Sequence, residues 1–169
     1  MSPDSKWFLV DYISVGGWNN TDIALVKADG SGEVTNLTES GYSDGDAKWV
    51  LDGKAMIWSS DRAGFRSHGS WGAERDVYIM FFDLEAYERF RLSKEEFALV
   101  KEKEDKEKEK DKQNDKKKDK KEKSEKDKEV TPLTFDLENC RDRIIRLTVN
   151  SSHLGDAVLS PDGDKLYYQ

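Results

Sequence analysis

The chain has 169 residues, and 37% of them are charged, with 28 Lys and Arg against 35 Asp and Glu. Much of this charge lies in one tract, 101–129, which holds 14 Lys and 12 acidic residues and no apolar residue. The other 140 residues carry 14 basic and 23 acidic side chains, about 26% charged, close to the usual value of about 25%. Outside the tract the chain therefore has the composition of an ordinary, somewhat acidic globular protein.

Composition and patterning exclude several classes of protein. No apolar run approaches the roughly 20 residues of a transmembrane helix, and the N-terminal residues lack the basic and apolar regions of a signal peptide. An acidic remainder without a one-signed basic run argues against nucleic-acid binding. Cys140 is the single cysteine, so an internal disulfide and a cysteine-based zinc site are excluded. The sequence leaves the cellular compartment open.

The chain contains an internal repeat. A shift of 110 residues aligns 33–58 with 143–168, with seven identities in 26 ungapped positions. Two further shifts, of 48 and 54 residues, align 2–10 with 50–58 and 22–28 with 76–82. The repeat unit is therefore about 50 residues long, and it is enlarged once by an insertion of about 56 residues.

Each repeat unit predicts four short strands, because β-branched and aromatic runs lie between turns rich in Asp, Gly and Ser. One unit is complete, a unit with three strands precedes it, and a unit with two strands follows. The predicted strands are 6–11, 22–28 and 33–37, then 46–50, 54–60, 76–82 and 142–148, then 156–159 and 165–168.

The turns between the first two strands of each unit follow one pattern. Asp52-Gly53 and Asp162-Gly163 are turn signals, because glycine takes a positive φ freely and the Asp carboxylate can accept from backbone amides. Ser5 replaces the glycine in the first copy. We therefore expect that turn to be strained or of a different type.

Four antiparallel strands that recur about every 40 to 50 residues are typical of β-propeller blades, each of which needs a neighbour on both faces. The predicted fold class is all-β: a fragment of a β-propeller with one complete four-stranded blade, two partial blades and a helical, charged insertion. Propellers close with about 4 to 8 blades, so we expect the chain to be a piece of a longer protein. The expected divisions are a partial blade at 1–45, three strands of the complete blade at 46–92, the insertion at 93–130, the last strand of that blade at 131–150, and the start of the next blade at 151–169.

The insertion opens with a helix signal. Ser93 fits an N-cap, and Glu96 three residues later completes a capping box. Lys and Glu pairs four residues apart can extend a solvated helix beyond its first turns. For 101–129 we expect a mixed-charge spacer that does not join the core, and an electrostatic tether or partner-binding arm is the alternative.

Loop 60–75 is the most distinctive stretch that does not repeat. Its candidate substrate-contact residues are Arg62, Phe65, Arg66, His68 and Trp71. In the functional interpretation an arginine pairs a peptide carboxylate and an aromatic residue offers an apolar surface. In the structural alternative the aromatic residues fill the gap between blades and the arginines meet an acidic surface.

No catalytic residue, metal or cofactor is predicted. His68 and His153 lie far from any Gly-x-Ser-x-Gly turn, and their separation shows no metal-ligand spacing. The acidic stretch 44–46 lacks the length and the bidentate Glu of a calcium site, so turn and cap roles are expected for its aspartates.

Three phrases carry a resemblance to known proteins. SPDSKWFLVDY, GDAKWVLDGKAMIWSSDR and GDAVLSPDGDKLYY resemble the propeller repeat, centred on Ser-Pro-Asp-Gly-Lys, of TolB-like proteins, prolyl-oligopeptidase-type enzymes and tricorn proteases. The order of loop 60–75, the charged tract, the RDRIIRLT strand and the SPDG turn is similar to the N-terminal propeller region of bacterial tricorn-like serine peptidases. These are PDZ-containing relatives of the C-terminal-processing peptidases.

The resemblance implies a noncatalytic propeller segment that gates or selects peptides for a catalytic domain downstream, and no residue of this chain matches the nucleophile motif. It implies two kinds of partner, a peptide or protein substrate bound through the parent enzyme and the neighbouring blades, and it allows an oligomeric parent. Among bacterial compartments it favours export over the cytoplasm. The alternatives are a TolB-like protein-protein interaction propeller and the propeller of a prolyl-oligopeptidase-type hydrolase.

Overall fold

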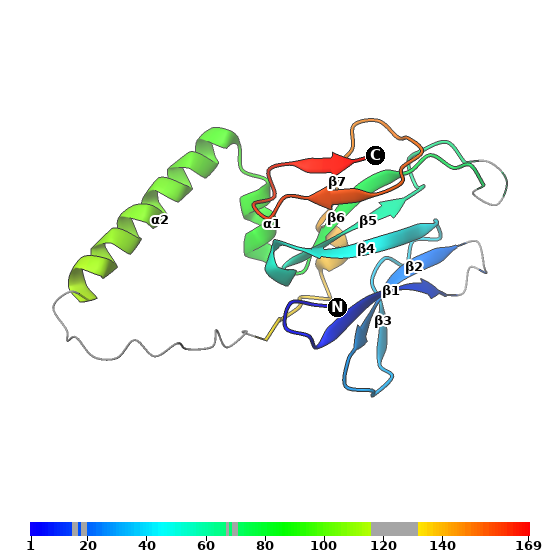
Figure 1. Cartoon of the computed structure of the whole chain (residues 1–169), viewed down its shortest axis with the longest axis horizontal. Helices are drawn as coiled ribbons and strands as arrows, with labels where there is room; N and C mark the ends of the chain where they lie inside the picture. The colour runs from blue at the N-terminus through cyan, green and yellow to red at the C-terminus, as the bar shows by residue number, and fades with distance from the viewer. Residues whose placement is uncertain (15–16, 18–19, 67, 69–70, 116–131) are drawn as a thin grey trace.

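The computed structural model describes residues 1–14, 17, 20–66, 68, 71–115 and 132–169. In this part of the chain nine strands form three antiparallel sheets, and two α-helices accompany them (Figure 1). The protein is thus mostly β, as the sequence predicts. The described residues form no closed sheet.

The strands follow one another along each sheet. The first sheet has the order β1-β2-β3, the middle sheet β4-β5-β6-β7, and the third β8-β9. A strand lies within or close to each of the nine predicted ranges. The bounds are β1 Trp7–Ile13, β2 Thr21–Lys27, β3 Val34–Asn36, β4 Asp44–Val50, β5 Ala55–Ser60, β6 Asp76–Phe81, β7 Ile144–Arg146, β8 Ala157–Leu159 and β9 Leu166–Tyr168.

β7 differs most from its predicted range of 142–148. The chain first forms a 3-10 turn over Cys140–Asp142, in which the N–H of Arg143 donates to the carbonyl of Cys140 at 3.1 Å. Strand pairing with β6 is then limited to Ile144–Arg146. The turn takes up the start of the predicted strand, because residues curled in a 3-10 turn cannot join an extended ladder.

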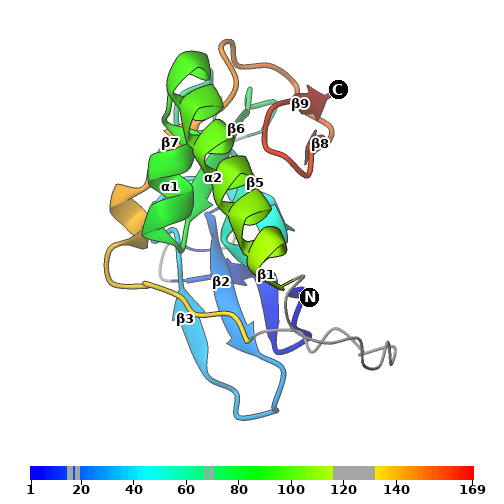
Figure 2. The ribbon, with the colours of Figure 1, turned by 90° about the vertical axis from the view of Figure 1, so that its left-hand side faces the viewer.

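The middle sheet is buried on both faces. Every residue of β5 and β6 is buried, and successive side chains point to opposite faces. Met56 and Trp58 pack against the first sheet, whereas Ala55 and Ile57 pack against the third sheet and α1. Figures 1 and 2 show the first and third sheets on opposite sides of the middle sheet. The core therefore consists of two apolar layers that share one central sheet.

The turns at Ser2 and Ser160 have the same hydrogen bonds, as the repeat predicts. The N–H of Ser5 donates to the carbonyl of Ser2 at 3.0 Å, and the N–H of Gly163 donates to the carbonyl of Ser160 at 2.9 Å. Ser5 has a φ of 59°, where Gly163 has 78°. Serine therefore keeps the turn type at the cost of a strained backbone, one of the two expected outcomes.

Both predicted Asp-Gly turns are present. Asp52 and Gly53 have φ values of 55° and 87°, which is the pattern of a type I′ hairpin turn. In the second turn Gly163 takes the positive φ, and Asp162 Oδ1 accepts from the N–H of Asp164 at 3.3 Å. The carboxylate role expected for these aspartates is thus present at Asp162.

Leu133 lies where the chain returns from the insertion, and it joins two equivalent turns. Its N–H donates to Asp4 Oδ2 in the first turn at 3.0 Å. Its side chain covers Gly53 in the second turn so closely that a Cβ there would lie 2.6 Å from Leu133 Cδ1. Glycine is therefore required at position 53 both for its positive φ and for its size.

Helix α1, Leu84–Phe90, is absent from the elements that the sequence predicts. The carboxylate of Asp83 caps its N-terminus. Tyr87 and Phe90 pack on Phe81 of β6, with ring centroids 5.6 and 5.2 Å away. This short helix is therefore held by the middle sheet, which it covers beside β8 and β9.

Helix α2, Lys94–Asp115, begins where the sequence predicts. The N–H of Glu96 donates to Ser93 Oγ at 3.2 Å, and the N–H of Ser93 donates to Glu96 Oε2 at 2.9 Å, which confirms the capping box. Figure 1 shows α2 extending away from the sheets. The expected spacer is thus helical from 101 to 115, since Lys and Glu favour helix and pair four residues apart. Residues 116–129 of the spacer lie outside the described residues.

Candidate functional site

Loop 60–75 joins β5 to β6 at one end of the middle sheet (Figure 1). β5 ends at Ser60 and β6 begins at Asp76, and these two residues lie opposite each other in register. Both are fully buried. The base of the loop is therefore fixed by the core, while its middle projects from the sheet.

Arg62 belongs to the fixed base of the loop. Its Nη2 lies 3.1 Å from Oδ2 of Asp44, which is fully buried. The guanidinium also lies over the rings of Tyr78 and Trp58, 4.8 and 5.4 Å from their centroids. Only 20% of the Arg62 side chain is exposed. Its charge is therefore already used within the chain.

The other four candidates lie on the projecting part of the loop. Phe65 and Trp71 are 67% and 69% exposed, and Arg66 and His68 are exposed as well. The Arg66 guanidinium lies 4.7 Å from the ring centroid of Tyr42 in the neighbouring loop. The loop thus presents two large aromatic side chains and a cation to solvent.

Two buried aspartates near this end have the same hydrogen-bond network. Thr148 Oγ1 donates to Asp76 Oδ1 at 2.6 Å and accepts from the N–H of the residue after Asp76 at 3.2 Å. Thr38 Oγ1 donates to Asp22 Oδ1 at 3.3 Å and accepts from the N–H of the residue after Asp22 at 3.0 Å. Each network ties the start of a strand to the chain beyond the last strand of its sheet. These aspartates are structural, and they explain the repeated Leu-Thr pair.

The hydrogen bonds around Asp22 keep its carboxylate ionised. Burial acts to raise the pKa of Asp22, but the N–H of Ser40 and the side chains of Asn36, Ser14 and Thr38 donate to it. Together these donors hold the pKa of Asp22 below its ordinary value of 3.8. The group therefore carries a negative charge inside the protein without a paired cation.

Asp11 and Asp46 meet where β1 contacts β4. Asp46 has a φ of 59° beside an irregularity in the register of β4, and its N–H donates to the Asp11 carboxylate. Asp11 reaches solvent on one side, yet partial burial and then the charge of Asp46 raise its pKa. Arg75 opposes this shift and donates to Ser59 Oγ at 3.0 Å. The contact between the first two sheets is therefore polar at this end.

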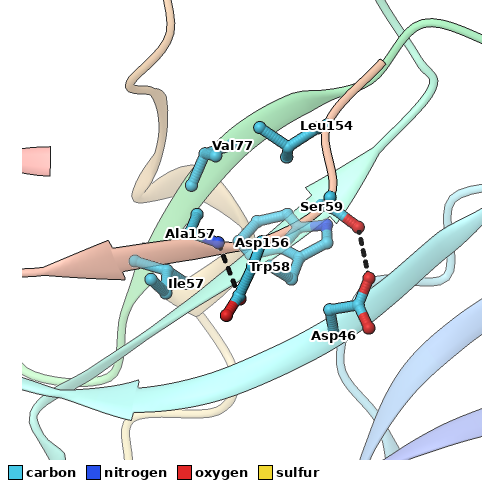
Figure 3. Close-up of a pocket in the computed structure, with 9 residues that line it drawn as sticks. Asp46, Ile57, Trp58, Ser59, Val77, Leu154, Asp156 and Ala157 are labelled. Atoms are coloured by element: carbon cyan, nitrogen blue, oxygen red, sulfur yellow. Dashed lines mark hydrogen bonds between the residues drawn. The ribbon is translucent and has the colours of Figure 1, made fainter. Parts of the chain in front are cut away.

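A small pocket lies between the middle and third sheets (Figure 3). Ser59 Oγ donates to Asp46 Oδ2 at 3.2 Å on one side, and the N–H of Ala157 donates to Asp156 Oδ1 at 2.7 Å on the other. The pocket has a volume of about 10 Å³, enough for about one water molecule. A peptide or an organic cofactor does not fit there.

The other reactive groups do not form a catalytic or metal centre. Cys140 is buried, and burial raises the pKa of its thiol. His68 and His153 are exposed and lie on different loops. In the part of the chain that the structure describes, no group of three or more His, Cys, Asp or Glu side chains is placed to hold a metal ion. None of the described helices is long and apolar enough to cross a bilayer.

Tyr42 and Asp44 were not among the candidate contact residues. Asp44 was expected to have a turn or cap role, but it lies opposite Ser60 in the β4 and β5 pair and receives Arg62. The available signal was a pair of opposite charges, one just before each end of a predicted hairpin. Tyr42 gave no comparable signal.

None of the family models, curated proteins and solved structures compared with this chain matches it. The case for a function therefore depends on the residues and their arrangement.

Proposed function

We propose that this chain is a noncatalytic propeller segment of a tricorn-like serine peptidase, where it helps to admit or select peptide substrates for a catalytic domain of the parent protein. The observation that carries the proposal is the head-to-tail stacking of repeated sheets. The exposed tip of loop 60–75 supplies the proposed peptide contact.

The sheets contact one another through equivalent faces. Leu9 of β1 is equivalent to Ile57 of β5, and each packs toward the sheet that follows. Ala157 of β8 is equivalent to Ala47 of β4, and each packs toward the sheet that precedes. Head-to-tail contacts of this kind form a ring when the rotation between neighbours closes, and a propeller is such a ring.

The outer faces of the stack support further blades as neighbours. Phe8, Val10 and Tyr12 alternate along β1 on the face away from the middle sheet, and each is at least 36% exposed. Val158 and Tyr167 lie opposite each other on the outer face of the third sheet and are 52% and 61% exposed. Both faces are apolar enough to receive another sheet.

The tip of loop 60–75 fits a peptide contact. Phe65 and Trp71 offer apolar surface, and the guanidinium of Arg66 can pair a carboxylate. Arg62 has a positioning role in this proposal, because it anchors the loop through Asp44. His68 lies on the same exposed part of the loop.

Peptide binding tests this role. A fluorescent peptide with a free carboxylate after an apolar residue is titrated with the chain and followed by anisotropy, beside the same peptide with a C-terminal amide. We expect the free acid to bind at least about tenfold more tightly than the amide, a difference of about 1.4 kcal/mol. A Phe65→Ala, Arg66→Ala, Trp71→Ala variant should lose binding, whereas Glu88→Ala on the exposed side of α1 should not. Equal binding by the triple variant and the wild type would overturn the peptide role.

The rest of the reading frame separates the parent families. More SPDG repeats, a PDZ-like region and a serine-bearing catalytic domain after Gln169 would support the tricorn-like proposal. A Gly-x-Ser-x-Gly hydrolase domain there would instead support a prolyl-oligopeptidase-type parent. An early stop would favour the TolB-like interaction propeller, in which the exposed Phe65 and Trp71 would contact a protein partner.

A further inference from the structure

β1 has one open edge. β2 pairs with one side of β1 over the whole range Trp7–Ile13, and within the described ranges no strand pairs with the other side. Seven residues of extended backbone therefore border solvent there. An edge of this length, with exposed apolar side chains beside it, is a template for pairing with another extended segment.

The backbone groups that point to this edge can be assigned. The N–H of Ala28 donates to the carbonyl of Lys6 at 2.8 Å, so the backbone groups of Lys6 point to β2. Backbone direction alternates along an antiparallel strand, so the groups of Leu9 and Asp11 point to the open edge. The carbonyl of Trp7 has the same direction, since it accepts from Ser2 on that side at 2.7 Å.

The repeat shows which kind of segment fits the open edge. Strands β1 to β3 correspond to β5 to β7, because the bond from Ala28 to Lys6 recurs as a bond of 2.9 Å from the N–H of Phe82 to the carbonyl of Lys54. In the middle sheet β4 lies beside β5 on the side away from β6. The open edge of β1 is the same edge, so it matches a strand like β4.

We propose that the open edge of β1 binds an extended peptide by strand addition, antiparallel to β1 and with the sequence pattern of β4. In the middle sheet Trp49 lies opposite Met56, the equivalent of Phe8. A bound peptide therefore places an aromatic residue opposite Phe8, on the outer face that also carries Val10. Backbone hydrogen bonds supply the affinity of such a site, and alternate side chains supply its specificity.

This inference does not depend on the proposed peptidase parent, because it concerns strand pairing at β1 and not the tip of loop 60–75. The two proposals therefore fail separately. Loss of peptide-acid binding at the loop leaves the β1 site intact, and a failure of strand addition leaves the loop contact intact.

The test uses a fluorescent, N-acetylated peptide with the sequence of residues 42–51, titrated with the whole chain and followed by anisotropy. We expect saturable binding to the wild type. Leu9→Pro removes an N–H that points to the open edge and should weaken binding at least about tenfold. Leu9→Ala removes the same apolar packing but keeps the N–H, and it should bind within about threefold of the wild type.

Hydrogen exchange of the wild type gives a second readout, which stands even if Leu9→Pro does not fold. Adding the peptide should slow exchange at the amides of Leu9 and Asp11 and leave Val10 unchanged, since the N–H of Val10 already points to β2. Absence of saturable binding, protection confined to loop 60–75, or a dimer formed through β1 that the peptide does not displace would overturn the proposal.

Discussion

The hydroxyl of Thr148 donates a hydrogen bond of 2.6 Å to Asp76 and accepts one of 3.2 Å from the N–H of Val77. Thr38 and Asp22 are linked in the same way in the first sheet. The two residues of a pair are 72 positions apart in one sheet and 16 in the other. The network is therefore retained although a long insertion separates its members in the middle sheet.

Thr148→Val tests the contribution of this network. The change keeps the shape of the side chain but leaves Asp76 and the N–H of Val77 without a buried partner, so the free energy of unfolding should fall by about 1–3 kcal/mol. Urea unfolding followed by tryptophan fluorescence measures the change. Thr148→Ser keeps the hydroxyl and should lose less stability. A Val variant as stable as the wild type would contradict the role given to the hydroxyl.

Gly53→Ala tests the contact with Leu133. Gly53 and Gly41 both have a positive φ, but a Cβ at 53 would meet Leu133 at 2.6 Å, and one at 41 would meet nothing within 4 Å. We therefore expect Gly53→Ala to destabilise the protein by about 1–3 kcal/mol more than Gly41→Ala. Thermal unfolding of both variants measures the difference. Equal losses would show that Leu133 does not cover position 53.

Arg62→Ala should be far more harmful than Arg66→Ala. The first change leaves the fully buried Asp44 without its cation, at a cost of about 3 kcal/mol. The second removes an exposed side chain and should change stability by no more than about 0.5 kcal/mol. Chemical unfolding of the two variants decides the matter, and the opposite order would contradict the internal position of Arg62.

Asp22 and Asp11 should contribute to acid stability with opposite signs. The pKa of Asp22 is lowered by folding, so its stabilisation is present above 3.8 and is lost as the pH falls through the folded-state value. The pKa of Asp11 is raised, so its favourable contribution is present below 3.8 and is lost as the pH rises through the folded-state value.

Unfolding free energies measured from about pH 6 down to about pH 3 test these signs. The advantage of the wild type over Asp22→Asn should shrink as the pH falls. The advantage of the wild type over Asp11→Asn should grow over the same range. Parallel curves for the wild type and Asp22→Asn would contradict the hydrogen-bond network around Asp22.

The strands could be predicted because apolar runs and Asp-Gly turns recur at fixed spacing. The short helix α1 could not be predicted from periodicity, since seven residues cover less than two full turns and only Tyr87 and Phe90 reach the sheet. Its usable signal was the capping residue Asp83. β7 was shortened by a 3-10 turn around Cys140, which has no clear mark in the sequence.

The candidate loop could be located from its composition, but the roles of its two arginines could not be separated. Arg62 and Arg66 lie four residues apart in the same Gly-containing loop. Their difference comes from the pairing of β4 with β5, which brings Asp44, 18 positions earlier, within 3.1 Å of Arg62. Such a contact depends on strand register and burial, which sequence composition does not report.

The most direct test of the account is an experimental structure of the product of the whole reading frame. We predict that another sheet covers the outer face of β1 to β3, that Phe8, Val10 and Tyr12 become buried, and that about 4 to 8 blades form a ring. A structure in which these three side chains remain in solvent and the sheets do not continue into a ring would contradict it.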